Sequence, residues 1–176
     1  MKRIVVTGPA GAGKSRLARD LGAAYGVDVV HIDTLFWRPG WVPTPPAVFE
    51  AMQRRELERD SWIVDAQYED MIPDWFDAAD AVIFVDASPL RCLWGVSRRR
   101  LDGDGGPDIP AGSEPAPIHR ALAKFVRLQW NYRRTVRPDL LADLARRRSP
   151  QRVVVLRTGR EGRRLMAHLP HQGESF

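Results

Sequence analysis

Residues 8–15 read Gly-Pro-Ala-Gly-Ala-Gly-Lys-Ser, a complete phosphate-binding loop (P-loop) of the form G-x-x-x-x-G-K-[ST]. The β-branched apolar run at residues 2–7 predicts a strand before it. The helical pattern that begins at residue 15 places Leu17 and Leu21 on one face after it. Strand, glycine loop and helix in this order are the context in which such a loop binds phosphate. We therefore predict a nucleotide site, with a glycine-rich turn and a solvent-facing lysine as the alternative.

The P-loop residues have distinct predicted roles. Its glycines let consecutive backbone N–H groups turn inward, and the helix that follows adds its partial positive charge. Lys14 is a predicted catalytic residue that contacts the β- and γ-phosphates, and the Ser15 hydroxyl is a predicted Mg²⁺ ligand. The predicted cofactors are therefore ATP and Mg²⁺. The predicted nucleotide-binding set is Gly8, Pro9, Ala10, Gly11, Ala12, Gly13, Lys14, Ser15 and Arg16.

The rest of the chain alternates short apolar strands with helical patterns. This alternation predicts a three-layer α/β P-loop kinase fold, with a five-stranded parallel sheet, helices on both faces and a lid segment. All 176 residues are predicted to form one domain. The predicted strands are residues 2–7, 27–32, 62–65, 81–85 and 153–156. The predicted helices begin at residues 15, 47, 89, 118, 138 and 159, with Gly26, Ser88 and Thr158 at helix ends.

Two segments depart from this alternation. Residues 34–60 are interpreted as an acceptor-side insertion, in which 34–46 are irregular and aromatic and a helix at 47–59 turns Phe49, Met52 and Leu57 inward. Residues 101–117 are too rich in Gly, Pro and Asp for regular structure and are predicted to form a lid. The helix after it, residues 118–136, is predicted to end before Pro138. Its predicted apolar stripe consists of Leu122, Phe125, Val126 and Trp130.

Aspartates follow three of the predicted strands, at the sheet edge where ligands bind in open parallel sheets. Asp65 is the predicted carboxylate of the Mg²⁺ shell. Asp33 is predicted to be catalytic and substrate-binding, because it could orient an acceptor hydroxyl or take its proton; the two aspartates could also exchange roles. Ordinary turn formation is the alternative for both, and it is the favoured interpretation for Asp86.

Arginines flank the predicted lid. Residues 98–100 are three arginines before it, and Arg127, Arg133, Arg134 and Arg137 follow it. Phosphoryl transfer between small molecules requires positive charge around the transferring group and exclusion of water. We predict catalytic roles for Arg99, Arg133 and Arg134, with a solvated helix face as the alternative for each.

Aromatic residues follow the second and third predicted strands. Trp37, Trp41 and Tyr68 are predicted to contact the acceptor by stacking on a planar group. The alternative, equally favoured, is that they and Phe36 form a small core of the insertion. The four histidines lack metal-ligand spacing and receive no role.

Composition limits the partners. The net charge of +5 and a pI near 10 admit nucleic acid as a less favoured partner, since phosphate recognition also uses arginines. A single cysteine, Cys92, lies in an apolar helical stretch, which predicts a packed core thiol. No apolar run reaches the ~18 residues of a membrane span, and no signal sequence is visible. We expect a cytoplasmic protein with no membrane partner.

Several stretches together resemble the adenylate-kinase-like branch of P-loop proteins, and more closely the bacterial DNA topology modulation proteins. They are residues 8–15, 31–33 with 37–41, 62–65 with Tyr68, 99–101, and Trp130 with Arg137-Pro138. The resemblance implies a five-stranded parallel sheet, an ATP site at the P-loop and a lid near 101–117. It departs at Ala66, where the group has glycine, and at Gly95, where it has an arginine.

These observations predict a kinase that transfers the γ-phosphoryl group of ATP to a nucleotide, nucleoside or other small molecule. The acceptor is expected between Asp33, Asp65 and the aromatic residues 36–41. The alternative is an ATP-dependent regulatory or DNA-associated NTPase without a small-molecule acceptor. No helix-turn-helix or zinc motif is visible, which favours the kinase. The nucleoside-monophosphate motifs of true adenylate kinases are missing, which disfavours AMP as acceptor.

Overall fold

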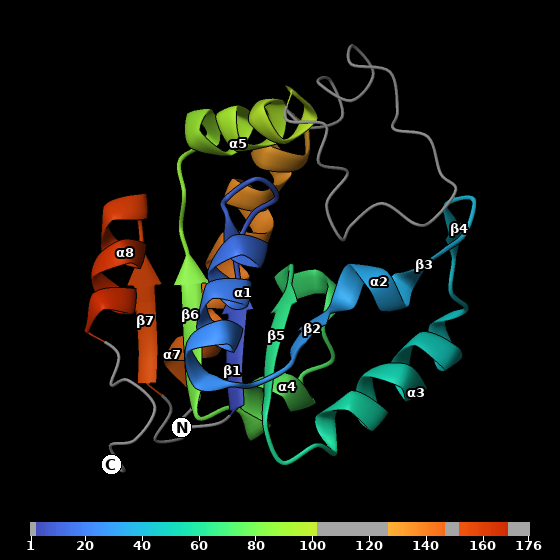
Figure 1. Cartoon of the computed structure of the whole chain (residues 1–176). Coiled ribbons are helices and arrows are strands. Elements are labelled where there is room, and N and C mark those ends of the chain that lie inside the picture. Colours follow the sequence, from blue (N-terminus) through green and yellow to red (C-terminus); the bar gives the residue numbers. More distant parts are fainter. Residues whose placement is uncertain (1–2, 102–126, 147–151, 169–176) are drawn as a thin grey trace.

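The computed structural model describes residues 3–101, 127–146 and 152–168, without the side chains of 99–101. Five parallel strands form one sheet in the order β2-β5-β1-β6-β7 (Figure 1). The predicted five-stranded parallel sheet is confirmed. The strands are β1 (Arg3–Thr7), β2 (Val29–His31), β5 (Trp62–Ala66), β6 (Ala81–Val85) and β7 (Arg152–Leu156).

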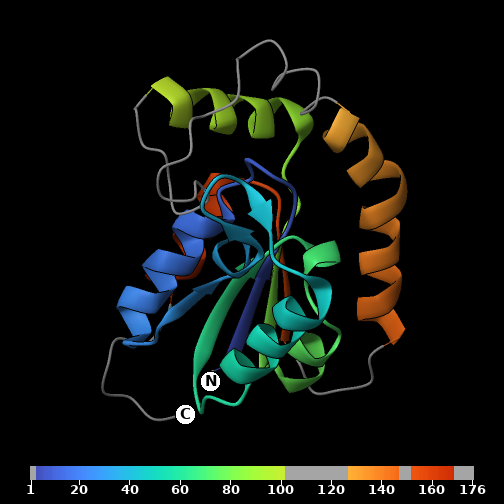
Figure 2. The same cartoon turned by 90° about the vertical axis from the view of Figure 1, so that its right-hand side faces the viewer.

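Helices cover both faces of the sheet, as Figure 2 shows with the sheet seen nearly edge-on. They are α1 (Lys14–Tyr25), α2 (Ile32–Phe36), α3 (Pro46–Leu57), α4 (Asp74–Ala78), α5 (Pro89–Leu101), α7 (Arg137–Arg146) and α8 (Gly159–Ala167). The described chain also contains a short 3₁₀ turn, η1 (Tyr68–Asp70), a helical stretch at residues 127–131 and a π-helical segment, η2 (Tyr132–Val136), that follows it. In the part of the chain that the structure describes, no helix is long and apolar enough to cross a membrane.

The apolar core has two layers, one on each face of the sheet. On one face, Leu17 and Leu21 of α1 pack with Cys92 of α5 and with the side chains of β1 and β6 that point to that face. On the other, Trp75 of α4 and Leu140 of α7 pack with Trp62 of β5. This is the predicted three-layer arrangement. Cys92 is fully buried, and burial raises the pKa of its thiol to about 11, which confirms the predicted core thiol.

The predicted helix ends are confirmed. Gly26 follows α1 in the left-handed conformation, with φ 65°. The Ser88 hydroxyl accepts a hydrogen bond of 3.4 Å from Arg91 N at the start of α5. Thr158 and Glu161 form a reciprocal capping box at the start of α8. Local sequence chemistry therefore sets these three boundaries.

The prediction that residues 34–46 are irregular is wrong. Helix α2 begins directly after β2 because it brings Ile32 into the core, where the side chain is fully buried. A two-stranded hairpin follows, in which β3 (Trp37–Arg38) pairs with β4 (Val42–Pro43). Its tight turn places both Gly40 and Trp41 at positive φ.

The inward face of α3 also differs from the prediction. Phe49 and Leu57 pack against the core, but Met52 is 37% exposed and the polar Gln53 is only 1% exposed. Gln53 is buried because its amide is satisfied: Oε1 accepts hydrogen bonds from Trp75 Nε1 and Ile72 N, and Nε2 donates to Asp70 O. The side chain thus ties α3 to the segment that follows β5.

The helix at residues 127–146 corrects two further predictions. Trp130 is 60% exposed, with the Arg134 guanidinium 4.2 Å from its ring centroid, so it belongs to no apolar stripe. Pro138 does not separate two helices, because the chain widens into η2 just before it and α7 then starts at Arg137. A π turn relieves the clash between a proline ring and the preceding turn. The predicted stripe residues 122, 125 and 126 and the predicted lid residues 102–117 lie outside the described residues.

Helix α5 crosses the carboxyl end of the sheet and packs directly on the P-loop (Figure 1). A Cβ placed on Gly95 would lie 2.3 Å from Gly11 O, and one on Gly11 would lie 2.3 Å from Cys92 O. Real Cβ atoms do not approach so closely, so both positions require glycine. Backbone therefore lies against backbone where α5 meets the loop.

We predict that Gly95→Ala lowers the free energy of unfolding by about 1–3 kcal/mol, because α5 must move away from the P-loop. Gly162→Ala is the matched control: it also lies within a helix, but nothing stands within 4 Å of the position that its added methyl group would take. That change should raise stability by about 0.5–1 kcal/mol. Urea denaturation of both variants measures the difference, and equal stabilisation by the two alanines would contradict the close packing.

Candidate active site

The P-loop connects β1 to α1 at the centre of the sheet's carboxyl edge. Gly8 has φ 147°, and a Cβ on it would lie 2.5 Å from Val85 O, so only glycine fits there. The loop closes with a hydrogen bond of 3.2 Å from Ala12 N to Pro9 O. Gly13 is left-handed and immediately precedes α1. The first turn of α1 contains no acidic residue, which keeps the positive end of the helix dipole available to an anion.

Lys14 and Ser15 are both buried at the start of α1. The Lys14 ammonium donates a hydrogen bond of 3.3 Å to Pro9 O, so the side chain curls back over its own loop. This geometry keeps a cation directly beside the loop's inward-turned backbone. An incoming phosphate would meet a preformed positive site.

Asp65 of β5 lies beside this cation. It is 6% exposed, and its Oδ2 accepts a hydrogen bond of 2.9 Å from His31 Nδ1. Burial alone would raise the pKa of the Asp65 carboxyl, but the His31 hydrogen bond, the Lys14 charge and the nearby Ser15 hydroxyl hold it below its usual range. Sequence reasoning assigned His31 no role. The available signal was the strand register, because parallel pairing places His31 opposite Asp65.

The residues around Asp65 fit a hydrated Mg²⁺. Its second carboxylate oxygen, Oδ1, is buried without a hydrogen-bond partner. The hydroxyl of Ser15 lies near enough to influence the Asp65 carboxyl. Mg²⁺ in phosphoryl-transfer sites takes one or two protein oxygens together with phosphates and waters, so a small donor set suffices. Accordingly, no group of three or more His, Cys, Asp or Glu side chains suited to a metal occurs among the described residues.

Acidic residues extend from Asp65 toward β2 and η1. Asp33 is half-buried and lies in the first turn of α2. The prediction placed it directly at the end of the strand, whereas β2 ends at His31. In η1, burial raises the pKa of Asp70, and the positive charge of Lys14 partly opposes that shift, whereas Glu69 is exposed. Both carboxylates follow the carboxyl end of β5, the strand that pairs in parallel with β1. They were not singled out from the sequence, because a one-turn 3₁₀ helix has no periodic signal.

The aromatic residues of the insertion pack on one another. The Trp37 ring meets Phe36 and Trp41 edge-to-face at centroid distances of 4.7 and 5.5 Å, and Phe36 also meets Phe49 of α3 at 5.1 Å. Tyr68 packs on Phe76 at 5.5 Å. Phe36, Trp37 and Trp41 thus form a cluster of edge-to-face rings in which Trp41 is 38% exposed. Acceptor contact by Trp37, Trp41 or Tyr68 stays a prediction.

The arginines after the predicted lid have different surroundings. Arg137 donates two hydrogen bonds, of 3.0 and 2.8 Å, to the Asp86 carboxylate, so Asp86 is one half of an ion pair. The Arg133 charge also lowers the pKa of Asp86. Arg134 lies over Trp130. Arg99 lies near the end of α5, and its side chain is outside the described residues.

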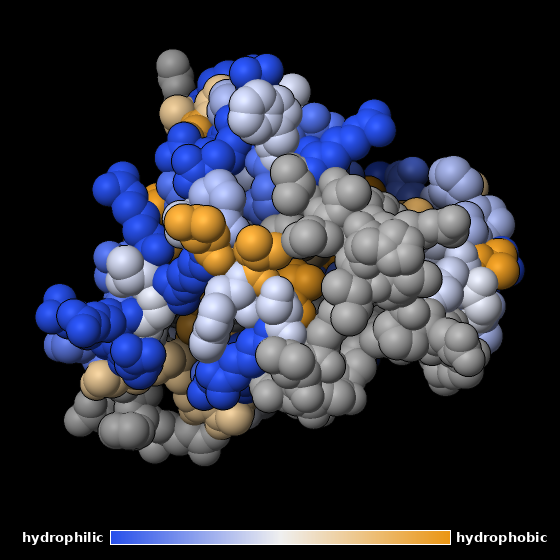
Figure 3. Space-filling view, turned by 90° about the horizontal axis from the view of Figure 1, so that it is seen from above, coloured by the Kyte–Doolittle hydropathy of each residue, from blue (hydrophilic) through white to orange (hydrophobic). Residues whose placement is uncertain are grey.

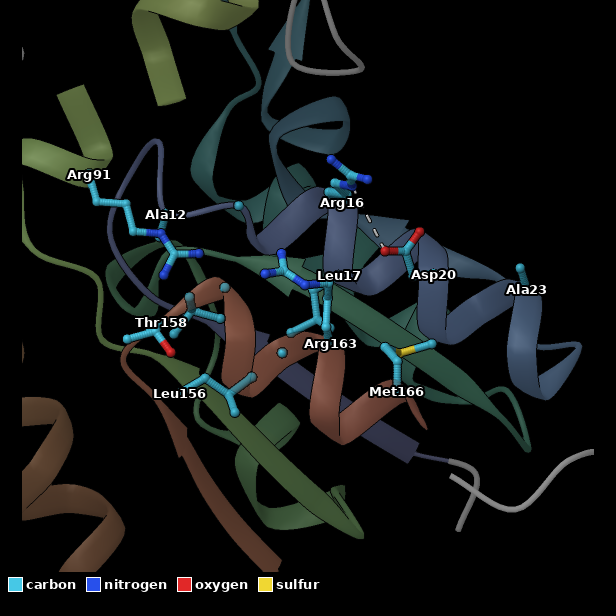
Figure 4. Close-up of a pocket in the computed structure, with 14 residues that line it drawn as sticks. Ala12, Arg16, Leu17, Asp20, Ala23, Arg91, Leu156, Thr158, Arg163 and Met166 are labelled. Atoms are coloured by element: carbon cyan, nitrogen blue, oxygen red, sulfur yellow. Dashed lines mark ion pairs between the residues drawn. The ribbon is translucent and has the colours of Figure 1, made fainter. Parts of the chain in front are cut away.

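A hollow of about 700 Å³ adjoins the P-loop on the side away from Asp65. Its floor includes Leu17, Leu156 and Met166, and Figure 4 shows arginines reaching toward it from α1, α5 and α8. The Arg91 guanidinium donates a 3.3 Å hydrogen bond to Arg157 O. A Cβ on Gly159 would lie 2.9 Å from Arg91 Nη2, so glycine makes room for this arginine. Sequence reasoning missed the hollow because α1, α5 and α8 meet only in the folded chain.

Viewed from above, the face over the carboxyl edge is mainly hydrophilic (Figure 3). Apolar side chains gather in a narrow area near its middle.

No protein-family model and no curated protein matches the sequence. The structure is similar to an unliganded sugar kinase from Janibacter sp. HTCC2649, with 13% identity, a TM-score of 0.48, and coverage of 95% of this chain and 91% of that chain. It is also similar to a deoxyadenosine kinase from M. mycoides with bound dATP (13%, TM-score 0.48, 95% and 98%). A gluconokinase from Sinorhizobium meliloti 1021 gives 16%, a TM-score of 0.46, and 94% and 91%. These similarities are similarities of the backbone fold.

We predict that Asp86→Asn lowers the free energy of unfolding by about 1–3 kcal/mol at pH 7, because Arg137 loses a charged acceptor. The Arg137 hydrogen bond is the main cause of the lowered Asp86 pKa. A lowered pKa in the folded state stabilises the fold above the unfolded value of about 3.9, and that stabilisation disappears as pH falls through the folded value.

Denaturation at several pH values measures this effect. The difference in free energy of unfolding between wild type and Asp86→Asn should be constant near neutrality and should become smaller below about pH 4. The exposed Asp60 lies in the turn before β5 and supplies the matched control, Asp60→Asn, which should match wild type throughout. If the free energy of unfolding of Asp86→Asn stays below that of wild type by the same amount down to about pH 2, the ion-pair interpretation is wrong.

Proposed function

We propose that this protein is an ATP-dependent phosphotransferase that moves the γ-phosphoryl group of ATP to a small-molecule acceptor. One observation carries the proposal: the preformed P-loop cation, Lys14, lies beside a buried carboxylate, Asp65, whose Oδ1 has no partner. A lysine and a carboxylate at the end of the neighbouring strand are the parts that hold nucleotide phosphates and their Mg²⁺.

The nucleotide would span two neighbouring sites. Its phosphates would lie on residues 8–16, where backbone N–H groups and the start of α1 favour negative charge. Its base and sugar would enter the adjoining hollow, whose apolar floor suits a planar ring and whose Arg91 could stack on it or contact phosphate. The Ser15 hydroxyl and Asp65 would hold hydrated Mg²⁺, which neutralises charge on the phosphates. His31 would fix the orientation of the Asp65 carboxylate.

The acceptor would lie on the β2 side, between Asp33, Asp65 and the hairpin aromatics Trp37 and Trp41, with Tyr68 nearby. Asp33 would orient the acceptor hydroxyl or take its proton. Arg99, Arg133 and Arg134 are the proposed sources of positive charge for the transferring group. We also propose that the chain belongs to the DNA topology modulation proteins. The name of that group specifies no chemical reaction.

We predict that Lys14→Ala reduces ATP turnover by at least about 10²-fold while the fold persists. Wild type should gain about 2.7 kcal/mol of stability with Mg·ATP at a hundred times its dissociation constant. The mutant should gain much less, because the phosphates lose their cation. Thermal melts with and without Mg·ATP, together with ADP release, provide the measurements.

Arg19→Ala is the control for Lys14→Ala, since it removes a positive charge from the exposed face of the same helix. It should bind and turn over ATP as wild type does. Equal ligand stabilisation and equal turnover in the Lys14 and Arg19 variants would overturn the nucleotide assignment.

We also predict that Asp33→Asn and Asp65→Asn fail in different ways. Asp33→Asn should retain ATP affinity and lose roughly 10²-fold or more of acceptor-dependent transfer, as expected for loss of a general base. Asp65→Asn should instead weaken the Mg²⁺ dependence of nucleotide binding. Titrations of MgCl₂ at fixed ATP and of acceptor at saturating Mg·ATP separate the two effects. Normal acceptor-dependent turnover in Asp33→Asn would leave Asp33 as an ordinary helix-start residue.

A further inference from the structure

The helix at residues 127–146 is tied to the P-loop near its start. Gln129 is 5% exposed, and its Nε2 donates a hydrogen bond of 3.0 Å to Ala10 O, a carbonyl of the P-loop. A buried side-chain amide is stable in a folded protein when its hydrogen bonds are made. This contact therefore connects the loop that would hold the phosphates with the helix that follows the predicted lid.

A second contact holds the same helix two turns later. Arg137 donates two hydrogen bonds to the carboxylate of Asp86, which directly follows β6. The P-loop follows β1, and β6 pairs with β1, so both contacts are made at the carboxyl edge of the sheet. Figure 2 shows this helix alongside the sheet. Gln129 and Arg137 thus fix the helix to that edge at two points.

Arg133 lies midway between these two contacts, four residues from each. Residues four apart lie on the same side of a helix. The π turn keeps this relation, because the guanidinium of Arg134 lies 4.2 Å from the ring centroid of Trp130. By the same spacing, Arg133 shares the side of the helix that carries Gln129. That side faces the P-loop.

The side chain of Arg133 is also available to a ligand. It is exposed, and no described residue forms a hydrogen bond or an ion pair with it. Arg134, by contrast, packs on Trp130. A free guanidinium binds phosphate oxygens through two parallel hydrogen bonds. Of the two arginines on this helix with a proposed role, Arg133 is therefore the better placed for the transferring group.

We infer that Gln129 is a positioning residue, whose hydrogen bond to Ala10 O holds the helix so that the Arg133 guanidinium reaches the transferring phosphoryl group. This inference rests on the proposed kinase function and deepens it. Gln129 itself touches no substrate and acts through Arg133.

The transfer step is balanced without Gln129. The acceptor oxygen forms a bond to the γ-phosphorus, and the bond between that phosphorus and the bridging oxygen of ADP breaks. The hydroxyl proton passes to the Asp33 carboxylate and then to solvent. Arg133 keeps its protons and stabilises the negative charge of the transferring group.

Single variants test the two roles. ADP release is measured against Mg·ATP concentration with water as the acceptor, so that no other acceptor is required. Arg133→Ala should lower kcat by about 10²-fold or more, as for a lost transition-state contact. Gln129→Met keeps the side-chain length and removes the donor, and kcat should fall about tenfold with an unchanged KM for ATP. A raised KM with unchanged kcat would instead make Gln129 a part of nucleotide binding and exclude the positioning role.

The double variant separates positioning from general packing. If Gln129 acts through Arg133, adding Gln129→Met to Arg133→Ala should lower kcat no further. A further tenfold loss would mean that the two residues act independently, which contradicts the inference. Urea denaturation of each variant shows that kcat refers to folded protein. If Gln129→Met does not fold, Gln129→Glu replaces it, since it keeps the size and also removes the donor.

Two controls come from the same helix. Thr135→Val removes a hydrogen bond of 2.8 Å from an exposed side chain to a backbone carbonyl, Asn131 O. Arg146→Ala removes an exposed arginine at the last residue of α7. Both variants should keep the wild-type kcat and KM. A loss in Thr135→Val as large as that in Gln129→Met would mean that any weakening of the helix lowers kcat, and the specific role of Gln129 would be wrong.

Binding separates a failure of this inference from a failure of the proposed function. Mg·ADP with aluminium fluoride mimics the transferring group and should stabilise wild type in thermal melts more than Mg·ADP alone. The additional stabilisation should be lost in Arg133→Ala and reduced in Gln129→Met. If Mg·ATP does not stabilise wild type, the proposed function fails and the inference fails with it. If it does, and Gln129→Met equals wild type in kcat and in the fluoride effect, only the inference is wrong.

Discussion

Two close backbone contacts fix the course of the P-loop between β6 and α5. Gly8 approaches Val85 O of β6, and Gly11 approaches Cys92 O of α5, at distances that leave no room for a Cβ. The loop therefore lies between a central strand and a crossing helix, and its curvature does not depend on a ligand. The position of Lys14 follows from this, since α1 begins where the loop ends. Cys92 contributes packing and backbone there, and its raised pKa keeps the thiol protonated at neutral pH.

Negatively and positively charged side chains lie on opposite sides of the P-loop. On the β2–β5 side lie the carboxylates Asp33, Asp65 and Glu69. On the β6–β7 side, Arg91 and Arg163 line the hollow, and Arg137 neutralises the carboxylate at the end of β6. Under the proposed function, a nucleotide with its phosphates at Lys14 would extend toward the arginine side. The opposite, acidic side would then receive the acceptor of the proposed transfer.

Sequence patterns predicted what depends on neighbours along the chain. The P-loop, the five strands and the caps at Ser88 and Thr158 are of this kind, because alternation, turn chemistry and capping are local. The pairing of His31 with Asp65 was missed since it needs the strand register, and the Asp86–Arg137 pair was missed since it joins residues 51 apart. Met52 was placed inside on periodicity alone. In the structure Gln53 is buried instead, because its amide makes three hydrogen bonds that no helical pattern encodes.

The absence of an arginine at Gly95 also has a physical explanation in the fold. Any side chain at this position would collide with the P-loop, because the Gly95 Cβ position lies 2.3 Å from Gly11 O. An arginine there would require α5 to stand farther from the loop. Arg91 lies four residues earlier, one helical turn away on the same side of α5, and its guanidinium already reaches the turn after β7. Close packing of α5 on the P-loop thus requires glycine at position 95, and Arg91, one turn earlier, lines the hollow beside the loop.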